Sequence, residues 1–206
     1  MKIIIASHNE HKIKEFIPLL EPFGFEVTSL LELNDHQEII EDGDTFEANA
    51  LIKAKSIAEK YQAYALADDS GLVVPAIGNE PGIYSARYSG EPKDDHRNNL
   101  KLLERMTGLE GDQRKAYFVS HLVVYAPNGA YLSVEGKAEG LILEVLQGDE
   151  GFGYDPLFYY PPAKQTFAQM PLDEKNKVSH RRRAIDQLQQ SLPTWLEGVQ
   201  DETTGS

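Results

Sequence analysis

An unbroken apolar run at residues 3–6, Ile-Ile-Ile-Ala, most constrains the fold of this 206-residue chain. A short continuous apolar run is typical of a buried strand. Polar residues follow at positions 7–9, and apolar residues then recur at helical spacing up to Leu20. Asn9 is a suitable N-cap for that helix. The pattern therefore predicts a buried strand that leads directly into an amphipathic helix.

Strand and helix patterns alternate along the rest of the chain. Further strands are predicted over residues 25–30, 65–67 (resuming at 72–74), 116–125, 131–136 and 157–160, and further helices over residues 45–61, 95–106 and around 185–195. The sequence Pro127-Asn128-Gly129 predicts a hairpin turn. Because strands and helices mix throughout, the predicted class is α/β or α+β with a central mixed sheet.

The composition excludes several classes of function. The chain has 20 Lys and Arg against 33 Asp and Glu, a formal net charge of −13. This acidity argues against non-specific binding to nucleic acid or to an anionic membrane surface, because both need a positive field. The absence of cysteine excludes disulfides and Cys-ligated zinc. With no transmembrane run and no signal-peptide pattern, the expected location is cytoplasmic.

The length predicts a single domain over residues 1–197, with room for two lobes. A chain of this length buries a sizeable core. Residues 198–206 are polar and acidic and are expected to form a disordered tail.

The segment between the first strand and the first helix, residues 7–12, is one candidate site. Free N–H groups and the positive end of the helix dipole suit a phosphate at a helix N-terminus. Lys12 lies about one turn into the helix and adds a positive charge. The alternative is an ordinary capped helix, since the segment matches neither a P-loop nor a dinucleotide-binding motif.

The adjacent carboxylates Asp68 and Asp69 form another candidate, because paired carboxylates hold divalent metals or act as general bases. Acid pairs alone are uninformative here, since six occur in the chain and roughly five are expected by chance. Position distinguishes this pair, because ligand sites favour the carboxyl ends of strands in open α/β sheets. Glu41, before the second helix, is the candidate third carboxylate.

Three further segments carry side chains suited to a ligand. Lys53 lies four residues after Asn49 on one side of the second helix, where it faces either a cleft or solvent. Residues 151–156, Gly-Phe-Gly-Tyr-Asp-Pro, suit the stacking of a planar ring, and the alternative is a turn with core aromatics. Residues 175–183 form the densest basic patch of the chain.

Six motifs, in order along the chain, resemble those of one family. They are Ala6-Ser7-His8-Asn9-x-x-Lys12, Thr45-Phe46-x-x-Asn49-Ala50-x-x-Lys53-Ala54, Ala67-Asp68-Asp69-Ser70-Gly71-Leu72, Pro81-Gly82-Ile83-Tyr84-Ser85-Ala86-Arg87-Tyr88, Gly151-Phe152-Gly153-Tyr154-Asp155-Pro156, and Glu174-Lys175 followed by Ser179-His180-Arg181. Each motif alone is weak, but six in order are highly specific. On these motifs the chain resembles the Ham1/RdgB-type inosine triphosphate pyrophosphatases from Lys2 to about Leu196.

This resemblance implies an elongated α/β fold, with a mixed central sheet flanked by helices and an active-site cleft between two lobes. It implies Mg²⁺-dependent hydrolysis of inosine, deoxyinosine and xanthosine triphosphates to the monophosphate and pyrophosphate, which cleanses the nucleotide pool. It also implies a homodimer that takes purine nucleoside triphosphates and binds neither nucleic acid nor membrane.

The roles of individual residues follow from the same resemblance. Asp69 matches the proton acceptor that activates water and also a metal-binding position, with Glu41 as the second metal carboxylate and Asp68 as support. The matched substrate-binding positions are Ser7, His8, Asn9, Lys12, Lys53 and Ser70 around the phosphates, and Phe152, Gly153, Tyr154, Asp155, Lys175, His180 and Arg181 around the base. Phe152 is expected to stack on the base, with Tyr154 and Asp155 beside it. His8 departs from the family's usual Gly and adds bulk near the phosphate turn.

Donors from His180 or Arg181 would select a 6-oxopurine, because the 6-amino group of adenine leaves such donors unpaired. A related pyrophosphatase with another base specificity is the alternative among enzymes. A haloacid-dehalogenase-type phosphatase needs Asp-x-Asp after its first strand, where this chain has Ser-His-Asn. A non-catalytic nucleotide-binding regulator is the alternative outside enzymes, and the intact set of Glu41, Asp68 and Asp69 argues against it.

Overall fold

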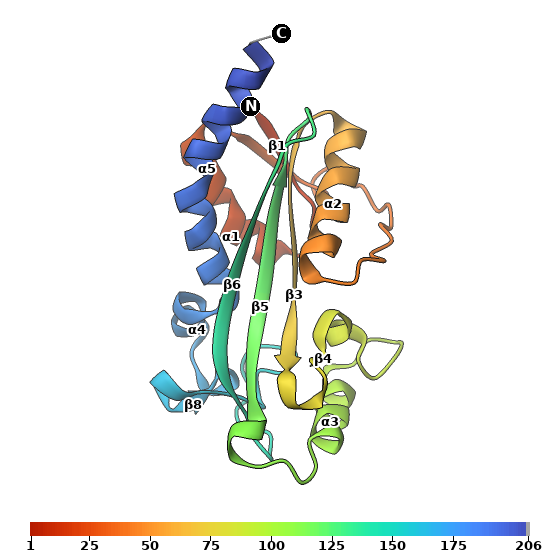
Figure 1. Ribbon diagram of the computed structural model, residues 1–206, viewed down its shortest axis with the longest axis vertical. Coiled ribbons are helices and arrows are strands. Elements are labelled where there is room, and N and C mark those ends of the chain that lie inside the picture. Colours follow the sequence, from red (N-terminus) through yellow and green to blue (C-terminus); the bar gives the residue numbers. More distant parts are fainter. Residues whose placement is uncertain (205–206) are drawn as a thin grey trace. The chain divides into compact units, whose positions relative to one another are not determined.

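The structure, a computed structural model, describes residues 1–204 and the side chains of residues 1–199 (Figure 1). The strands are β1 (Lys2–Ile5), β2 (Glu26–Ser29), β3 (Tyr64–Val74), β4 (Glu80–Pro81), β5 (Lys115–Tyr125), β6 (Tyr131–Ile142), β7 (Phe158–Tyr160) and β8 (Gln165–Thr166). The α-helices are α1 (Glu10–Leu20), α2 (Phe46–Tyr61), α3 (Asp95–Arg105), α4 (Leu172–Val178) and α5 (His180–Thr204). Among the short 3₁₀ helices, η3 (Gly82–Arg87) and η6 (Phe167–Gln169) contribute to the packing described below.

The strands form one mixed sheet in the order β2-β1-β3-β5-β6-β7-β8, with β4 beside β3. β1 pairs in parallel with both β2 and β3, and its last residue, Ile5, lies opposite Leu66 of β3. The pairs β3–β4, β6–β7 and β7–β8 are antiparallel. The fold class is therefore α/β, a mixed sheet flanked by helices, as predicted.

The chain forms two compact units. The first contains Met1–Asp69, His121–Glu135 and the chain from Ala184 onward, and the second contains Ser70–Ser120 and Gly136–Arg183. β3, β5 and β6 each contribute residues to both units, so neither unit is one continuous stretch of sequence.

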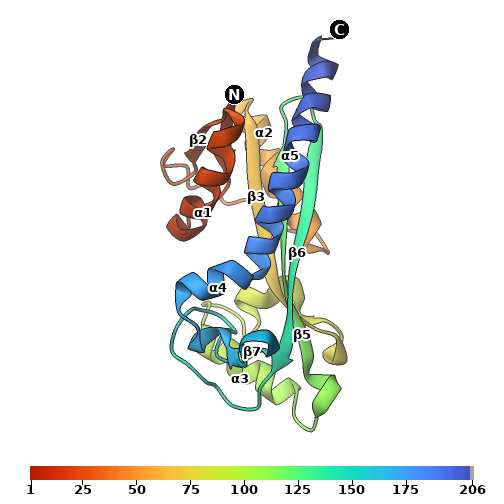
Figure 2. The same cartoon turned by 90° about the vertical axis from the view of Figure 1, so that its left-hand side faces the viewer.

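Helices cover both faces of the strands in the first unit (Figures 1 and 2). α1 and α5 pack against one face, which includes Ile3 of β1 and Leu66 of β3. α2 packs against the other face, which includes Ile4 and Ala67. Because alternate residues of a strand point to opposite faces, the apolar run at residues 3–6 fills both layers of the core at once.

Aromatic side chains fill the core of the second unit. Phe118, Phe158 and Phe167 contact one another, with ring centroids 4.6, 5.9 and 4.8 Å apart. Leu102 of α3 is fully buried in the same cluster, which also contains Tyr154. α3 and the loop that carries Tyr154 therefore share one core.

The hairpin predicted at residues 127–129 joins β5 to β6. The Ala126 N–H donates to the Ala130 carbonyl at 2.8 Å. Gly129 has a φ of +95°, a conformation that glycine adopts without a steric penalty. The hairpin turn that the sequence predicts between these two strands is therefore confirmed.

Two elements extend beyond their predicted limits. β6 continues past Gly136 to Ile142, because its last residues pair with β7. α5 runs to Thr204, past residue 198 where a tail was expected, and buried Val199 extends its apolar face. Residues 205–206 of that tail lie outside the described residues. Neither α5 nor any other helix in the described part of the chain is long and apolar enough to cross a membrane.

Leu188 of α5 is fully buried in the core of the first unit, so Leu188→Ala is expected to lower the free energy of unfolding by about 2–5 kcal/mol. The loss combines removal of apolar contacts with the cavity left behind. Urea unfolding followed by circular dichroism measures it. Gln187→Ala, at an exposed position on the same helix, is the control and is expected to change stability by less than about 0.5 kcal/mol. Equal losses would contradict the packing of α5.

Candidate functional site

β3 carries Asp68 and Asp69 in its interior. The prediction that the strand breaks at these residues was wrong, because β3 continues without interruption to Val74. The strand that ends here is its parallel neighbour, since β1 stops at Ile5, opposite Leu66. The two carboxylates therefore lie just past the carboxyl end of β1, on a longer strand that continues beyond it.

Successive residues of a strand point to opposite faces, so Asp68 and Asp69 face different helices. Asp68 shares a face with Leu66, which packs with α1 and α5. Asp69 shares a face with Ala67, which packs with α2. The adjacent acids are thus one carboxylate on each face of the sheet.

On the first face, Lys12 binds Asp68, with Nζ 2.7 Å from Oδ2. Asp68 is almost fully buried, and Lys12 is partly buried. Asn9 is the N-cap of α1, as predicted: its Oδ1 accepts from the backbone N–H groups of His11 at 2.9 Å and Lys12 at 3.3 Å. A phosphate at this turn would compete with Asn9 for these donors, which leaves the Lys12 ammonium as its main positive partner.

The turn before α1 is held by its own side chains. The Ser7 hydroxyl accepts from the Asn9 N–H at 3.1 Å. The His8 Nε2 lies 2.5 Å from the backbone carbonyl of Asp35, and this nitrogen carries the hydrogen because its partner can only accept. The His8 ring also stacks on His36, with centroids 5.7 Å apart. His8 therefore ties the turn to the loop that leads to Glu41.

On the second face, Asn49, Lys53 and Glu41 surround Asp69. Asn49 is buried, its Oδ1 accepts from the Gly43 N–H at 2.9 Å, and its amide donates to the Asp69 carboxylate. The Lys53 Nζ lies 3.1 Å from the Glu41 Oε2. Because Asn49 and Lys53 are four residues apart on α2, one face of that helix holds both the turn after Glu41 and the side chain of Asp69.

Burial raises the pKa of the Asp69 carboxyl to about 6. The negative charges of Glu41 and Asp68 act in the same direction, whereas the Lys53 ammonium and the hydrogen bond from Asn49 oppose them. A carboxyl with this pKa is ionised at neutral pH, yet it accepts a proton more readily than an ordinary aspartate does. These are the properties of a general base.

Among the described residues, no group of three or more acidic or histidine side chains is arranged to hold a metal ion. The second face nevertheless presents two carboxylates near each other, Glu41 and Asp69. Mg²⁺ is commonly bound by one or two carboxylates together with substrate phosphates. This pair of carboxylates is therefore suited to a hard divalent cation once a phosphate ligand completes the site.

In the second unit, the loop at residues 148–155 is organised around Asp155. This residue is buried, and its Oδ2 accepts from the Lys175 ammonium and, at 3.0 Å, from the Phe152 N–H. Burial raises the pKa of Asp155, against the opposing effects of Lys175 and the Phe152 N–H. The carboxylate of Asp155 therefore holds the loop together from inside.

The two aromatic residues of this loop have different environments. Phe152 is 60% exposed, and the Lys175 ammonium lies 4.5 Å from its ring centroid. Tyr154 is 3% exposed, and its hydroxyl donates to the Ser85 carbonyl at 2.7 Å. Phe152 is therefore the ring available for stacking, whereas Tyr154 is a core residue with a satisfied hydroxyl.

His180 and Arg181 are the first residues of α5. His180 is buried and stacks on Phe118, with centroids 5.0 Å apart and planes at 18°. Arg181 beside it is partly exposed. Ser70 follows Asp69 on β3 and is also partly exposed. Of the predicted base-recognition residues, Lys175 and Phe152 are thus in mutual contact, and His180 packs on the aromatic core.

Comparison with known proteins decides the family of the chain. A family model described as the Ham1 family matches residues 3–191. The chain belongs to the Ham1 family. Among its relatives, a dITP/XTP pyrophosphatase of Desulforamulus reducens is 47% identical over 192 residues, which cover 93% of this chain and 96% of that protein. A dITP/XTP pyrophosphatase of Bacillus subtilis is 47% identical over 189 residues, covering 92% and 96%.

Solved structures of Ham1 proteins have the same fold as this chain. The Ham1 protein of Staphylococcus aureus is 39% identical with a TM-score of 0.88, covering 94% of this chain and 99% of that one. A nucleoside-triphosphatase, or dITP/XTP pyrophosphatase, of Mycobacterium abscessus is 40% identical with a TM-score of 0.80, covering 91% and 97%. The family and fold class expected from the six motifs are confirmed.

In this Ham1-family chain, sequence reasoning missed the role of Asp35. Its carboxylate accepts from the Lys60 ammonium and the Tyr61 hydroxyl, both at 2.7 Å. Hydrogen bonds from Lys60 and Tyr61 hold the pKa of Asp35 well below its usual range. These contacts anchor the loop that leads to Glu41 onto the end of α2. No pattern in the sequence distinguishes this acid from the other loop acids.

Asp69→Asn is expected to stabilise the metal-free Ham1-family chain by up to about 3 kcal/mol at pH 7.5, because ionised Asp69 is unfavourable in the fold. The pKa is about 6 in the folded protein against 3.8 for an ordinary aspartate. The folded state therefore binds more protons between these values, and stability falls as the pH rises through that window. Urea unfolding in EDTA measures the difference. At pH 4 it should shrink below about 1 kcal/mol, and an Asn variant no more stable than wild type at pH 7.5 would contradict the raised pKa.

Gly151 and Gly153 of the Ham1-family chain have φ values of +76° and +60°, but their surroundings differ. A Cβ at Gly151 would overlap the Asp155 carboxylate, whereas one at Gly153 meets nothing within 4 Å. Gly153→Ala is therefore expected to lower the free energy of unfolding by about 1–2 kcal/mol, through backbone strain alone. Gly151→Ala is expected to lose about 3 kcal/mol or more, because the buried Asp155–Lys175 pair must shift. Urea unfolding compares the two variants. Equal losses of unfolding free energy would contradict this expectation, because they would show that the Asp155 side chain moves aside at no cost.

Proposed function

We propose that this chain hydrolyses non-canonical purine nucleoside triphosphates, namely ITP, dITP and XTP, to the nucleoside monophosphate and pyrophosphate. The names of its relatives, dITP/XTP pyrophosphatases at 47% identity, support this substrate class. The observation that carries the proposal is Asp69, a carboxyl whose pKa is raised to about 6 and which Asn49 holds beside Lys53 and Glu41. A base of this kind suits the activation of water next to phosphate charge.

In the proposed reaction, Asp69 orients a water molecule and accepts its proton. The water oxygen forms a bond to the α-phosphorus, and the bond from that phosphorus to the α,β-bridging oxygen breaks, so that pyrophosphate leaves. Lys12 and Lys53 neutralise negative charge on the phosphates. Their positive charges stabilise the transition state, in which negative charge develops on the phosphate oxygens. Both ammonium groups now lie on carboxylates, Asp68 and Glu41, which hold them in place before a phosphate arrives.

We further propose Mg²⁺ as the cofactor, held by Glu41 and Asp69. When bound, it would supply positive charge to the phosphate oxygens. Asp68 takes a supporting role, since it lies on the opposite face of β3 and is paired with Lys12. Ser7, His8, Asn9 and Ser70 complete the residues that we assign to the phosphate end.

The base end is assigned to residues of the second unit. Phe152 presents an exposed ring on which a purine stacks, with the Lys175 ammonium on that ring. His180 and Arg181 supply donors for the 6-oxo group, which favours hypoxanthine and xanthine over adenine. Gly153, Tyr154 and Asp155 shape the loop, as their contacts with its backbone and core support.

The family resemblance also supports a homodimer in the cytoplasm. Both features join the substrate class and the metal as parts of the proposal. Size measurement in solution and localisation of the tagged chain test them separately from the chemistry.

Product analysis in ¹⁸O-labelled water tests the reaction. ITP with Mg²⁺ is expected to give inosine monophosphate that carries the label, together with unlabelled pyrophosphate, as read by ³¹P NMR and mass spectrometry. ATP should turn over little, and EDTA should abolish activity. Asp69→Asn is expected to lower kcat by about 10²–10⁴-fold, because the proton acceptor is lost.

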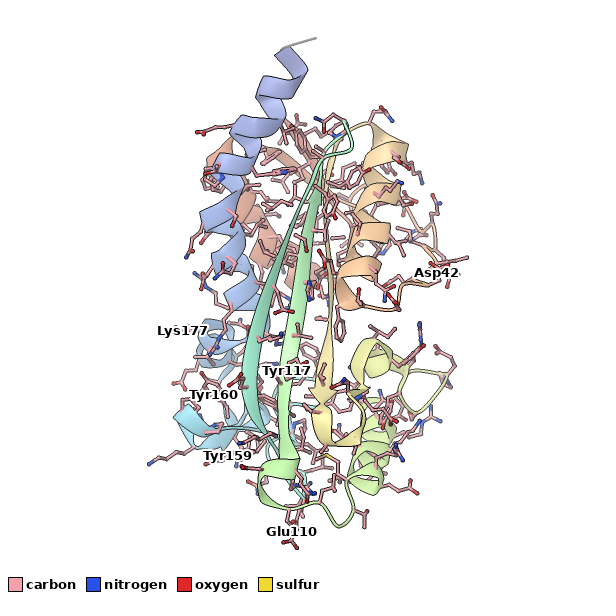
Figure 3. All side chains as sticks on the ribbon, viewed as in Figure 1. Asp42, Glu110, Tyr117, Tyr159, Tyr160 and Lys177 are labelled. Atoms are coloured by element: carbon pink, nitrogen blue, oxygen red, sulfur yellow. The ribbon has the colours of Figure 1, made fainter. Side chains whose placement is uncertain are left out.

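Asp42→Asn is the matched control. Asp42 is exposed on the loop that leads into α2 and lies directly after Glu41 (Figure 3). The variant removes one negative charge from the same loop and should retain wild-type activity. Inosine diphosphate with orthophosphate, or label in the pyrophosphate, would contradict attack at the α-phosphorus. A pyrimidine triphosphate hydrolysed faster than ITP would indicate another base specificity, and tight ITP binding without turnover would indicate a regulator.

A further inference from the structure

Two side chains of helix α3, those of Asp95 and Asn99, bind the backbone of the loop that carries Phe152. We call this pair of hydrogen bonds the grip. The Gly153 N–H donates to the Asp95 carboxylate at 2.8 Å. The Gly153 carbonyl accepts from the Asn99 amide, also at 2.8 Å. Both backbone polar groups of one loop residue are thus bound by side chains of a single helix. Asp95 and Asn99 are four residues apart, which places them on the same face of α3.

Asn99 is built into this contact. The residue is 3% exposed, and its Nδ2 also donates to the Asp95 backbone carbonyl at 2.8 Å. Both partners of that nitrogen are carbonyl oxygens, which can only accept, so the orientation of the amide is fixed. Asn99 therefore links the first turn of α3 to the loop with one amide group.

The grip falls directly beside the exposed ring. Gly153 has a φ of +60° and turns both of its polar groups toward α3. On the other side, the Phe152 N–H is held by Asp155, and the Tyr154 hydroxyl is held by the Ser85 carbonyl. The backbone on both sides of Phe152 is therefore fixed, while its ring remains 60% exposed.

We propose that Asp95 and Asn99 are positioning residues for purine binding, which act by holding Phe152 in the orientation that stacks on the base. This inference rests on the proposed function, in which Phe152 is the stacking ring. A loop that must be ordered when the ligand arrives weakens binding, whereas a loop that is already held does not. The grip acts on the base end, so it affects affinity for the nucleotide more than the rate of the chemical step.

Asp95→Ala and Asp95→Asn separate the grip from other effects. Alanine removes the acceptor for the Gly153 N–H, whereas asparagine keeps a carbonyl oxygen at the same place without the charge. Asn99→Asp has the same shape as Asn99 but cannot donate to the Gly153 carbonyl. Glu104→Ala, at an exposed position on the same helix, is the matched control.

For Asp95→Ala and Asn99→Asp, we expect the Kd for inosine monophosphate, measured by calorimetry, to rise about tenfold or more. The KM for ITP should rise in parallel, with kcat changed by less than about threefold. Inhibition by pyrophosphate, which lacks a base, should be unchanged. Asp95→Asn should restore most of the nucleotide affinity, and Glu104→Ala should match wild type. A purely structural role would instead lower kcat, the binding of inosine monophosphate and the binding of pyrophosphate together.

Hydrogen exchange at the Gly153 amide, measured by NMR, tests the grip without any assumption about the reaction. Exchange at this amide should accelerate about tenfold or more in Asp95→Ala and stay near the wild-type rate in Asp95→Asn. If exchange accelerates but inosine monophosphate binds as tightly as to wild type, the inference is overturned whatever the reaction proves to be. If both respond as expected while the products from ITP are not the monophosphate and pyrophosphate, the proposed function fails and the positioning role of Asp95 and Asn99 stands.

Discussion

A β-strand turns each successive side chain to the opposite face, and the arrangement of the first unit depends on this rule at Asp68 and Asp69. Each of these neighbouring acids meets its own lysine or amide on its own face. Asp68 is neutralised by Lys12 from α1, whereas Asp69 faces Asn49 and Lys53 from α2. The two acids consequently acquire different chemical properties. One is a paired structural charge, and the other is a partly desolvated carboxyl with a pKa near neutrality.

The second unit holds one aromatic ring, that of Phe152, in a fixed place although the ring is exposed to water. Side chains of this unit bind the backbone around Phe152 and leave the ring exposed. The Asp155 carboxylate accepts from the Phe152 N–H, and the Tyr154 hydroxyl donates to the Ser85 carbonyl. Two side chains of α3 bind both the N–H and the carbonyl of Gly153. Because these partners are buried or partly buried, water competes poorly for them. An exposed apolar side chain is thereby presented without a long segment of exposed apolar surface.

Much of this fold follows from local patterns in the sequence. The apolar run before Asn9 predicts β1, the cap and α1. The helix predicted over residues 45–61 is α2, which begins one residue later, at Phe46, and ends at Tyr61 as predicted. β3 was predicted to break because its interior contains polar residues. The early end of the neighbouring strand and the partners that α1 and α2 supply to each acid explain why acids are tolerated there. A single sequence does not show which elements lie beside which.

The candidate sites were predictable to the degree that they rest on short motifs. The loop at residues 151–156 was expected to be either a stacking platform or a turn with core aromatics, and its two aromatic residues divide these roles between them. Environment decides this, since Phe152 and Tyr154 differ in burial and not in chemical type. The contributions of Asp35 and of α3 depend on contacts between segments distant in sequence, which spacing within one segment does not reveal.

The division of the chain between its units has a consequence for biosynthesis. The core of the first unit combines β1 and α1 from the start of the chain with Leu188 and Leu192 of α5 near its end. Because α5 is synthesised after these segments, the part of their apolar surface that α5 covers stays exposed until that helix has been made. The second unit ends at Arg183, in the first turn of α5, so all of its residues are synthesised before the rest of that helix. The unit that carries the proposed catalytic carboxylate is therefore the later of the two to complete its core.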